Sequence, residues 1–416
     1  MRPISACSAS MTPAESRRRP VVMLSAGEVS GDLHGGALAA ALRRLSPEVR
    51  LLGMGGERMA AAGVELLADA RQMAIVGFTE ALRRLPAVRR RFARLRDAML
   101  TQHPDVLVTI DYPGFNLRLA EVARAADIPV VYFVPPQIWA WRAGRIRVIR
   151  ERVSLVLAVF PFERPLYRQA GVPVEFVGHP IADALVGAPS RADARRRLGL
   201  AESDLVIGLL PGSRALEIAR LTPIIRDAVA TVASRHPRAR FVLALAPTVT
   251  AADVSAHFGA SQRIDVVTDA HAVMSASDLL LATSGTATLE AALLGAPMVV
   301  IYRFSWLSQM VGHAVLRIPW ISLPNIILGR GVVPELFLRH EVTAERLAAT
   351  ALRLIETPGA LDAQRSAFRE LAAEVGEPGV AQRAAARVLS IIGTSQGRHE
   401  SIGIPVTVSP RLAGAS

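Results

Sequence analysis

The 416-residue sequence contains no lysine, one cysteine and no long uninterrupted run of apolar residues. The single cysteine, Cys7, excludes a disulfide framework and a cysteine-ligated metal site. Runs of about 18 or more apolar residues, which a membrane-spanning helix requires, do not occur. The first twenty residues lack an apolar segment ahead of their arginine cluster, which argues against a signal peptide and leaves either Met1 or Met11 as the start. These absences predict a cytoplasmic globular protein.

Two patterns that are common in nucleotide-dependent enzymes are also missing. No D-x-D pair occurs, so the carboxylates that usually hold a metal-bound nucleotide sugar are absent, and we expect no metal and no cofactor. No G-x-G-x-x-G follows a predicted strand, which excludes an NAD-dependent enzyme. The charge of a bound phosphate would therefore have to be balanced by arginine side chains and helix amino termini.

Arginine supplies all of the basic charge, and 48 basic against 36 acidic residues give a net charge of +12. Two interpretations of this arginine excess are open. One is codon bias in a GC-rich genome, and the other is a protein surface that binds lipid headgroups, nucleotides or nucleic acid. Residues 83–96 and 142–152 are arginine patches with interleaved apolar residues, which suits amphipathic segments on an anionic membrane; a solvated helix face is the alternative. No RNA- or DNA-binding module is recognisable and aromatic residues make up 5%, so no nucleic-acid partner is expected.

Short apolar runs alternate with helical stretches, and this pattern restarts near Leu205 after a polar, arginine-rich stretch. Such alternation predicts parallel sheets covered on both faces, hence a doubly wound α/β fold. We expect two Rossmann-like domains, 21–186 and 187–392, that face a cleft, with disordered tails at 1–20 and 393–416. The predicted strands are Val21–Ser25, Val49–Gly53, Val106–Ile110, Val130–Val134, Leu155–Phe160, Val174–Val177, Leu205–Leu210, Phe241–Leu245, Asp265–Val267, Leu279–Ala282 and Met298–Tyr302.

The segment LLPGSRALEI, Leu209–Ile218, leaves a predicted strand, turns, and enters a helix. Gly212 permits close approach of the backbone to a ligand, and the first N–H groups of the following helix suit a diphosphate. Arg214 adds a bidentate donor. The alternative is a plain turn with a surface arginine.

A second segment, Ala282–Val300, repeats this arrangement with Ser284, Gly285 and Thr286 at the turn. Glu290 lies four residues after Thr286 and therefore on the same helix face, where its carboxylate could accept two ribose hydroxyls. A capped helix with a solvated glutamate is the alternative. The two segments together predict a nucleotide-diphosphate site in the second half.

In the first half, a buried strand ends in Asp111, and a sharp turn and a helix follow. A single carboxylate at the mouth of a parallel strand is well placed for a general base, although an aspartate that caps the helix is the alternative. Trp139 and Trp141 follow the next predicted strand and suit sugar stacking, lipid contact or buried packing. His179, in GHP, is interpreted as a hinge residue or a site residue.

The ordered motifs AGEVSGD, GMGGERM, VGFTE, IDYPGFN, PPQIWAWR, PFE, GHPIAD, LLPGSR-x-x-E, SGTATLEA and SLPN resemble those of lipid-A-disaccharide synthases. The match covers about Val21–Leu389. The resemblance implies an inverting glycosyltransferase of the GT-B fold. It would transfer 2,3-diacylglucosamine from UDP to the 6-hydroxyl of 2,3-diacylglucosamine 1-phosphate, giving a β-1,6-linked disaccharide and UDP.

The resemblance also implies roles for individual residues. Asp111 would be the general base, and some relatives carry a second aspartate where this chain has Gly114. Arg214 would face the phosphates, whereas Asn325 of SLPN would either touch UDP or shape its loop. The acid of the AGEVSGD loop, Glu28, stands where a phosphate would have to sit in a nucleotide-binding turn, so this loop would bind the acceptor sugar instead. The expected donor-site residues are Gly212, Ser213, Arg214, Glu217, Ser284, Gly285, Thr286, Glu290 and Asn325, and the expected acceptor-side residues are Glu28, Ser30, Gly31, Asp32, Trp139 and Trp141.

The acyl chains of such substrates require an apolar surface. Ala74–Leu85 followed by the first arginine patch, or else Trp306–Trp320, would dock on the cytoplasmic face of the inner membrane. The oligomeric state stays open, with a homodimer among the expected partners. Another GT-B transferase that uses a UDP-sugar, or a UDP-sugar epimerase, would need the same fold and donor site, and only the acceptor-side motifs argue against them.

Overall fold

The computed structural model describes residues 19–70, 78–139, 144–246, 249–250, 264–303, 319–338 and 340–400. Trp141 lies outside what the structure describes, as do residues 74–77 and 306–318 of the two expected membrane segments, whereas residues 78–85 form the start of helix α3 (Phe78–Gln102). Two compact units divide the chain: one runs to Val130 and resumes at Ala385, and the other is Val131–Ala384.

The first sheet has seven strands in the order β3-β2-β1-β4-β5-β6-β7. The pairs β1–β2 and β1–β4 are parallel, and every residue of β1 and β4 is buried, as expected for strands covered on both faces. The strands are β1 (Val21–Ala26), β2 (Arg50–Gly55), β3 (Glu65–Asp69), β4 (Val106–Ile110), β5 (Val130–Phe133), β6 (Leu155–Ala158) and β7 (Val174–Phe176). The accompanying helices are α1 (Val29–Leu45), α2 (Glu57–Ala61), α3 (Phe78–Gln102), α4 (Pro113–Ala125), α5 (Arg145–Arg152), α6 (Glu163–Gln169) and α7 (Ile181–Ala184).

The second sheet has six strands in the order β10-β9-β8-β11-β12-β13, and all of its pairs are parallel. The strands are β8 (Val206–Leu210), β9 (Arg240–Ala244), β10 (Ile264–Val267), β11 (Leu279–Thr283), β12 (Met298–Ile301) and β13 (Glu335–Leu336). The helices are α8 (Arg191–Arg197), α9 (Ala215–Arg235), α11 (Ala270–Ala276), α12 (Thr286–Leu293), α14 (Leu323–Leu328), α15 (Ala344–Glu356), α16 (Ala360–Val375) and α17 (Val380–Glu400).

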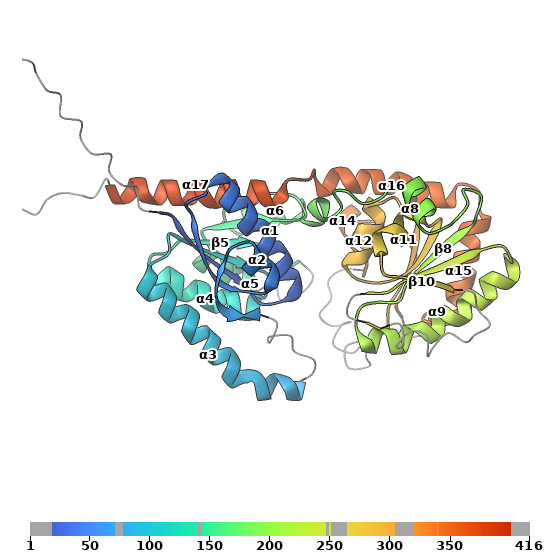
Figure 1. The fold of residues 1–416 in the computed structure, drawn as a ribbon, viewed down its shortest axis with the longest axis horizontal. Helices are drawn as coiled ribbons and strands as arrows, with labels where there is room; N and C mark the ends of the chain where they lie inside the picture. Colours follow the sequence, from blue (N-terminus) through green and yellow to red (C-terminus); the bar gives the residue numbers. More distant parts are fainter. Residues whose placement is uncertain are drawn as a thin grey trace, which may run out of the picture. The chain divides into compact units, whose positions relative to one another are not determined.

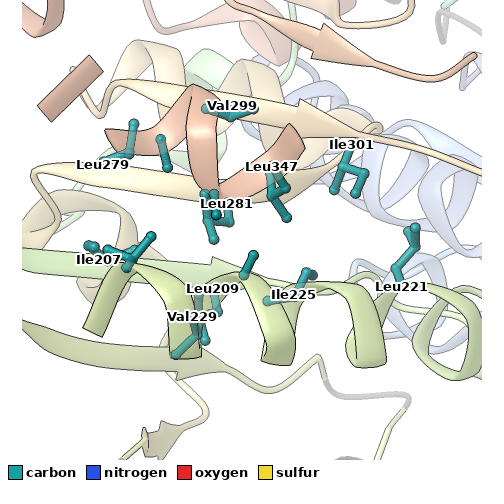
Figure 2. Close-up of a cluster of buried hydrophobic side chains, with 14 of the residues drawn as sticks. Ile207, Leu209, Leu221, Ile225, Val229, Leu279, Leu281, Val299, Ile301 and Leu347 are labelled. Carbon is teal, nitrogen blue, oxygen red and sulfur yellow. The ribbon is translucent and has the colours of Figure 1, made fainter. Parts of the chain in front are cut away.

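One face of the second sheet carries the hydrophobic core drawn in Figure 2. Leu209 and Leu281 of neighbouring strands pack there against Ile225 of α9 and Leu347 of α15, all at 0% exposure. Figure 1 shows α9 and α15 on this side of the strands and α11 and α12 on the other. The sheet is therefore covered on both faces, and its chemistry has to lie at the strand ends.

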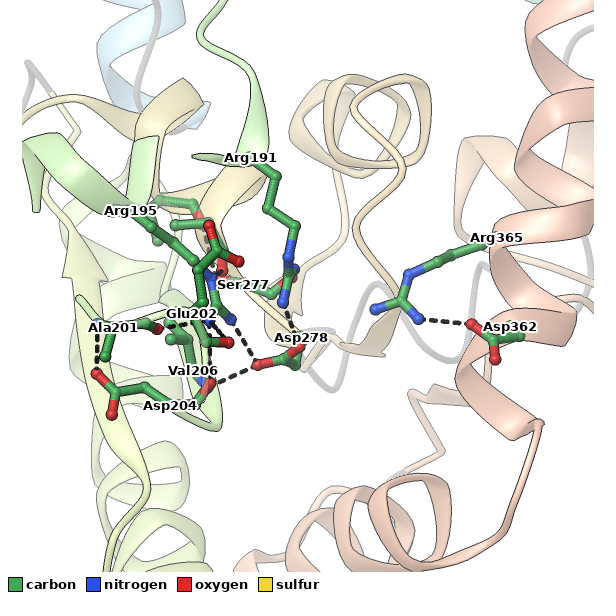
Figure 3. Close-up of polar contacts among 12 residues, drawn as sticks. Arg191, Arg195, Ala201, Glu202, Asp204, Val206, Ser277, Asp278, Asp362 and Arg365 are labelled. Carbon is green, nitrogen blue, oxygen red and sulfur yellow. Dashed lines mark hydrogen bonds and ion pairs between the residues drawn. The ribbon is translucent and has the colours of Figure 1, made fainter. Parts of the chain in front are cut away.

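A buried arginine holds α8 against the second sheet (Figure 3). The Arg195 guanidinium donates to Asp278 Oδ2 at 2.9 Å and to the carbonyls of Ala276 at 3.1 Å and Ala201 at 2.8 Å. Arg191, which is more exposed, donates to Asp278 Oδ1 at 2.5 Å. Asp278 also accepts the backbone N–H of Val206, the first residue of β8, at 2.8 Å. This network fixes the arginine-rich stretch that precedes β8 in the sequence.

The GHPIAD segment is tied to the junction between α16 and α17. Asp183 accepts backbone N–H groups of Val380 at 3.0 Å and Ala381 at 2.9 Å, and thereby caps α17. The backbone N–H of His179 donates to the carbonyl of Val375 at 3.1 Å. The role of His179, as a hinge residue or a site residue, stays a prediction.

Two features of the structure bear on the expected domain bounds without deciding them. Helix α17 continues to Glu400, so the segment expected to be disordered from 393 onward begins inside a helix. Along the sequence, the division between the two compact units falls after Val130, whereas the last strand of the first sheet is β7 and the first strand of the second sheet is β8. The expected domain boundary at 186 therefore stays a prediction.

Candidate functional site

The AGEVSGD loop joins β1 to α1, and its two acids have different surroundings. Asp32 is 9% exposed and accepts backbone N–H groups of Gly56 at 2.7 Å and of Arg58 and Met59 at 3.1 Å. Its carboxylate thus clamps the GMGGERM turn to α1. Glu28, by contrast, is exposed at the N-cap position of α1 and makes no side-chain capping bond there.

The two small residues between these acids lie in the first turn of α1. Ser30 is exposed, whereas Gly31 is buried. A Cβ at Gly31 would approach that of Ala26 at the end of β1 to 3.2 Å. Gly31 therefore permits close packing of α1 on β1, and Glu28, Val29 and Ser30 form the accessible part of the loop.

The β4–α4 turn carries the candidate base in a strained backbone. Asp111 and Tyr112 are consecutive non-glycine residues with φ of 48° and 46°, a conformation that costs on the order of 1–3 kcal/mol for each residue. The fully buried Asn116 of α4 holds the turn by donating to the carbonyls of Asp111 at 2.7 Å and Ile110 at 3.1 Å. It accepts the Ser25 hydroxyl of β1 at 2.7 Å. Strain that is retained by a dedicated buried amide is typical of a functional turn.

Burial raises the pKa of the Asp111 carboxyl, and a backbone hydrogen bond from Tyr112 opposes this in part. A carboxylate with a raised pKa is a stronger base, which suits proton abstraction. The N-cap residue of α4 is Tyr112 and not Asp111. This position argues against the alternative of an aspartate that only caps the helix.

The AGEVSGD loop and the β4–α4 turn pack together at the carboxyl edge of the first sheet. Their strands pair in parallel with Ala26 opposite Ile110. The Tyr112 ring lies against Gly27, where a Cβ would come within 2.3 Å of it. Burial raises the pKa of Tyr112, the nearby charge of Glu28 raises it further, and Arg91 of α3 lowers it. The structure therefore brings Glu28 and the Asp111 turn to one place.

Trp139 is partly buried in an aromatic cluster that follows β5 and β6. Its ring meets those of Phe160 and Phe162 edge-on, with centroids 6.0 and 5.1 Å away. Its Nε1–H donates to Glu163 Oε1 at 3.2 Å, and Glu163 is 0% exposed. The ring of His179 lies 5.0 Å from that of Phe160. Sequence reasoning assigned no role to Glu163, whose only signal was its place in the PFE motif.

The PGSR turn between β8 and α9 depends on its glycine. Gly212 has φ of 114°, and a Cβ there would lie 2.8 Å from Glu217 Oε2. Glu217 accepts the backbone N–H of Ser213 at 3.3 Å and the Arg214 guanidinium at 2.8 Å. The Arg214 side chain is 78% exposed. The Glu217 carboxylate therefore holds the PGSR turn in shape, and the Arg214 side chain lies at the surface.

The SGT turn leaves the same edge of the second sheet, because β11 pairs with β8 in parallel, Leu210 opposite Ala282. Gly285 is the N-cap of α12 and makes no side-chain capping bond, and both Gly285 and Thr286 are exposed. Glu290 on the following turn lies 3.1 Å from His271 Nε2, and both side chains are partly exposed. His271 was not among the predicted site residues.

Asn325 is 1% exposed, and protein groups occupy its amide completely. It donates to the carbonyl of Val333 at 2.9 Å and to Glu335 at 2.8 Å, and accepts two backbone N–H groups, of Val332 at 2.7 Å and Val333 at 2.9 Å. This bonding favours the loop-shaping alternative over contact with UDP.

Glu335 extends this bonding to the SGT turn. It accepts the Ser322 hydroxyl at 2.6 Å and the backbone N–H of Ile321 at 2.9 Å. Ser284 donates its own hydroxyl to the Ile321 carbonyl at 2.7 Å. Asn325 and Glu335 are thus linked by hydrogen bonds to the SGT turn of the expected donor site, through Ile321 and Ser322 just before α14.

Comparisons with known proteins agree with these motifs. Residues 22–387 match the family model described as "Lipid-A-disaccharide synthetase". A protein of Geobacter metallireducens described as lipid-A-disaccharide synthase is 43% identical over 374 residues, 89% of this chain and 97% of that protein.

Two solved structures show the same fold at 14% sequence identity. The UDP-GlcNAc 2-epimerase from Neisseria meningitidis bound to UDP-GlcNAc matches with a TM-score of 0.60, covering 90% of this chain and 100% of that one. The calicheamicin glycosyltransferase CalG4 matches with a TM-score of 0.58, covering 91% and 99%. The predicted fold class is confirmed: two parallel-sheet α/β domains of the GT-B type.

Proposed function

The chain belongs to the lipid-A-disaccharide synthase family, which makes it a glycosyltransferase, and from this premise we propose its reaction in detail. It transfers 2,3-diacylglucosamine from UDP to the 6-hydroxyl of 2,3-diacylglucosamine 1-phosphate. The products are the β-1,6-linked disaccharide 1-phosphate and UDP. The observation that carries this proposal is the half-buried carboxyl of Asp111, whose pKa is raised, on a strained turn held by Asn116.

The transfer is a single displacement. Asp111 takes the proton of the acceptor 6-hydroxyl while the hydroxyl oxygen bonds to the anomeric carbon of the donor sugar. The bond from that carbon to the UDP oxygen breaks at the same time, and attack opposite UDP inverts the configuration. A positioned base of this kind supplies about 10²–10⁴-fold in rate. Glu28, on the same edge as Asp111, accepts hydrogen bonds from other hydroxyl groups of the bound acceptor.

The diphosphate of the donor binds at the PGSR and SGT turns. Both turns leave one edge of the second sheet, and both lead into helices whose N-cap residues make no side-chain capping bond. Their first N–H groups and Arg214 would balance the phosphate charge. Arg214 has to exchange its bond to Glu217 for the phosphate. Glu290 binds the ribose hydroxyls.

The acyl chains place the protein at the cytoplasmic face of the inner membrane. In the described part of the chain, we find no helix long and apolar enough to cross a bilayer. Helix α3 exposes Arg89, Arg90, Arg94 and Arg96, which would meet anionic headgroups. Reversing the charge of these arginines should abolish sedimentation with anionic vesicles, and unchanged sedimentation would refute the docking surface.

The test of the reaction uses purified protein in detergent with both proposed substrates and EDTA. We expect disaccharide and UDP to appear in equal amounts. Release of UDP without disaccharide would retain the donor site and overturn the acceptor assignment. Absence of turnover, with EDTA or with added Mg²⁺, would overturn the proposed reaction and direct the search to other UDP-sugars.

A further inference from the structure

Glu163 is a fully buried acid at the start of α6 that the transfer mechanism does not use. Its Oε2 accepts the backbone N–H groups of Val159 and Phe160, each at 3.2 Å. Its Oε1 accepts the indole N–H of Trp139 at 3.2 Å. One oxygen therefore holds the β6–α6 turn, and the other reaches a side chain of the segment that follows β5.

Trp139 is held by two different kinds of contact. Phe160 and Phe162 stack on each other with centroids 5.3 Å apart and planes 9° apart, and the indole meets both at 89°. Edge-on packing alone fixes the tilt of the indole but leaves it able to slide. The bond to Glu163 adds a directional constraint at Nε1. The Glu163 carboxylate and the rings of Phe160 and Phe162 together define one orientation for the Trp139 ring, which remains partly exposed.

We propose that Glu163 is a positioning residue for the transfer reaction, whose carboxylate orients the Trp139 indole so that this ring stacks on a sugar of the acceptor. This inference rests on the proposed function, since the acceptor role of Trp139 belongs to it. A partly exposed aromatic ring with a fixed polar edge is a common surface for binding a sugar. Glu163 itself is too deeply buried to touch the substrate.

The protonation state of Glu163 controls this orientation. Burial raises the pKa of Glu163 to about 7, although its three hydrogen bonds oppose the shift. Because Oε2 already accepts two N–H groups, an added proton lies on Oε1, the oxygen that holds the indole. Protonation therefore weakens the bond to Trp139, and the ring becomes less fixed as the pH falls below about 7.

The titratable neighbours of Glu163 are Tyr167 on the same helix and His179 beyond Phe160. Burial and the charge of Glu163 raise the pKa of Tyr167, so this phenol stays protonated throughout the neutral range. The His179 Nδ1 accepts the backbone N–H of Ile181 at 3.2 Å, and its ring contacts Phe160. A test must therefore separate the effect of protonating Glu163 from any effect of the His179 side chain.

The first experiment follows the indole N–H signals of the full-length protein, labelled with ¹⁵N in its four tryptophans, by NMR. Trp139→Phe identifies the Trp139 signal. We expect this signal to titrate with a midpoint near pH 7 and to lose this titration in Glu163→Gln. The glutamine accepts the two backbone N–H groups with its oxygen and turns its NH₂ towards the indole, which removes only that bond. His179→Gln should leave the titration in place. A pH-independent Trp139 signal, or one that still titrates in Glu163→Gln, would overturn the proposal.

The second experiment measures disaccharide formation at pH 8 for the unaltered protein, Glu163→Gln, Trp139→Phe and the double variant. We expect either single substitution to raise the KM for the acceptor about tenfold and to leave that for the UDP-sugar unchanged. The double variant should be no worse than either single one. Glu370→Gln, the same chemical change at an exposed ion pair with Arg330, should have no effect.

A merely structural role for Glu163 would lower kcat or raise both KM values together, and either result would overturn the proposal. The difference in acceptor KM between the unaltered protein and Glu163→Gln should also shrink below pH 7, where the unaltered protein loses its indole bond. Failure of the unaltered protein to form disaccharide would refute the proposed function. The NMR titration would then still decide whether Glu163 orients Trp139.

Discussion

The side-chain amide of Asn116 donates a 2.7 Å hydrogen bond to the backbone carbonyl of Asp111, and not to its carboxylate oxygens. The same nitrogen lies 3.1 Å from the carbonyl of Ile110, and the amide oxygen accepts the Ser25 hydroxyl. The strained turn is therefore fixed through its backbone. The carboxyl of Asp111 can consequently be changed without loss of the Asn116 bonds that hold the turn.

Asp111→Asn should remove most of the turnover and leave the fold and the affinity for UDP intact. The substituted amide cannot take a proton, and loss of one positioned base costs about 10²–10⁴-fold in rate. Turnover is measured by disaccharide formation, and UDP binding is measured by calorimetry on the same sample. A variant that retains nearly full activity would refute the role of Asp111 as base. A variant that loses UDP affinity as well would indicate damage beyond the acceptor side.

Gly212→Ala should weaken UDP binding. At φ of 114° an alanine is strained, and its Cβ would lie 2.8 Å from Glu217 Oε2, so the PGSR turn has to change shape. We expect at least a tenfold loss of UDP affinity, with little change in the affinity for the acceptor. Gly199→Ala is the matched control, because Gly199 has φ of 65° but no atoms within 4 Å of the added Cβ, and it follows α8, outside the proposed donor site. Equal UDP affinity in the two variants would argue against a phosphate site at this turn.

The fold was largely predictable from the sequence because its strands are buried on both faces. Every predicted strand has a counterpart, and β4 spans Val106–Ile110 as predicted. Two strands of the structure were not predicted from the sequence, and both have weak sequence signals. In β3, Glu65–Asp69, only one residue is buried, and the apolar run is short. Strand β13 has only two residues. Edge strands of this kind pair through their backbone, which leaves little trace in the sequence.

The candidate site was predictable only in its loops. Gly212, Ser284 and Asp111 are marked by local patterns at strand ends. The supports of these loops are long-range contacts between residues that show no common pattern, as between Ser25 and Asn116 or between Trp139 and Glu163. Similarly, the sequence predicts Asp32 as a site residue, yet in the structure its carboxylate accepts hydrogen bonds from three backbone N–H groups.

Glu163 should make the stability of the protein depend on pH in the direction opposite to that of most carboxylates. Its folded pKa of about 7 lies above the ordinary glutamate value of 4.5, so the folded chain binds more protons than the unfolded chain between these two pH values. The free energy of unfolding therefore falls as the pH rises from about 4.5 to 7, by a contribution of about 3 kcal/mol. Glu163→Gln lacks this titration. Denaturant unfolding at several pH values should show the unaltered protein losing stability relative to the variant, and parallel curves would contradict the shift.

Arg195→Ala should destabilise the second sheet far more than Arg191→Ala, although both arginines bind Asp278 (Figure 3). The Arg195 side chain is 1% exposed and also donates to backbone carbonyls, which lose their partner on truncation. Removing one partner of a buried pair costs about 3–5 kcal/mol. Arg191 is 42% exposed, so its pair contributes about 1 kcal/mol or less.

Urea unfolding followed by circular dichroism measures both effects, and retained UDP binding before the transition shows that each variant starts folded. Equal shifts in the two variants would mean that Asp278, and not the carbonyls around Arg195, carries the stabilisation. A larger loss for Arg195→Ala is expected because the alanine leaves several buried carbonyls without a donor, whereas water replaces the Arg191 guanidinium at the surface.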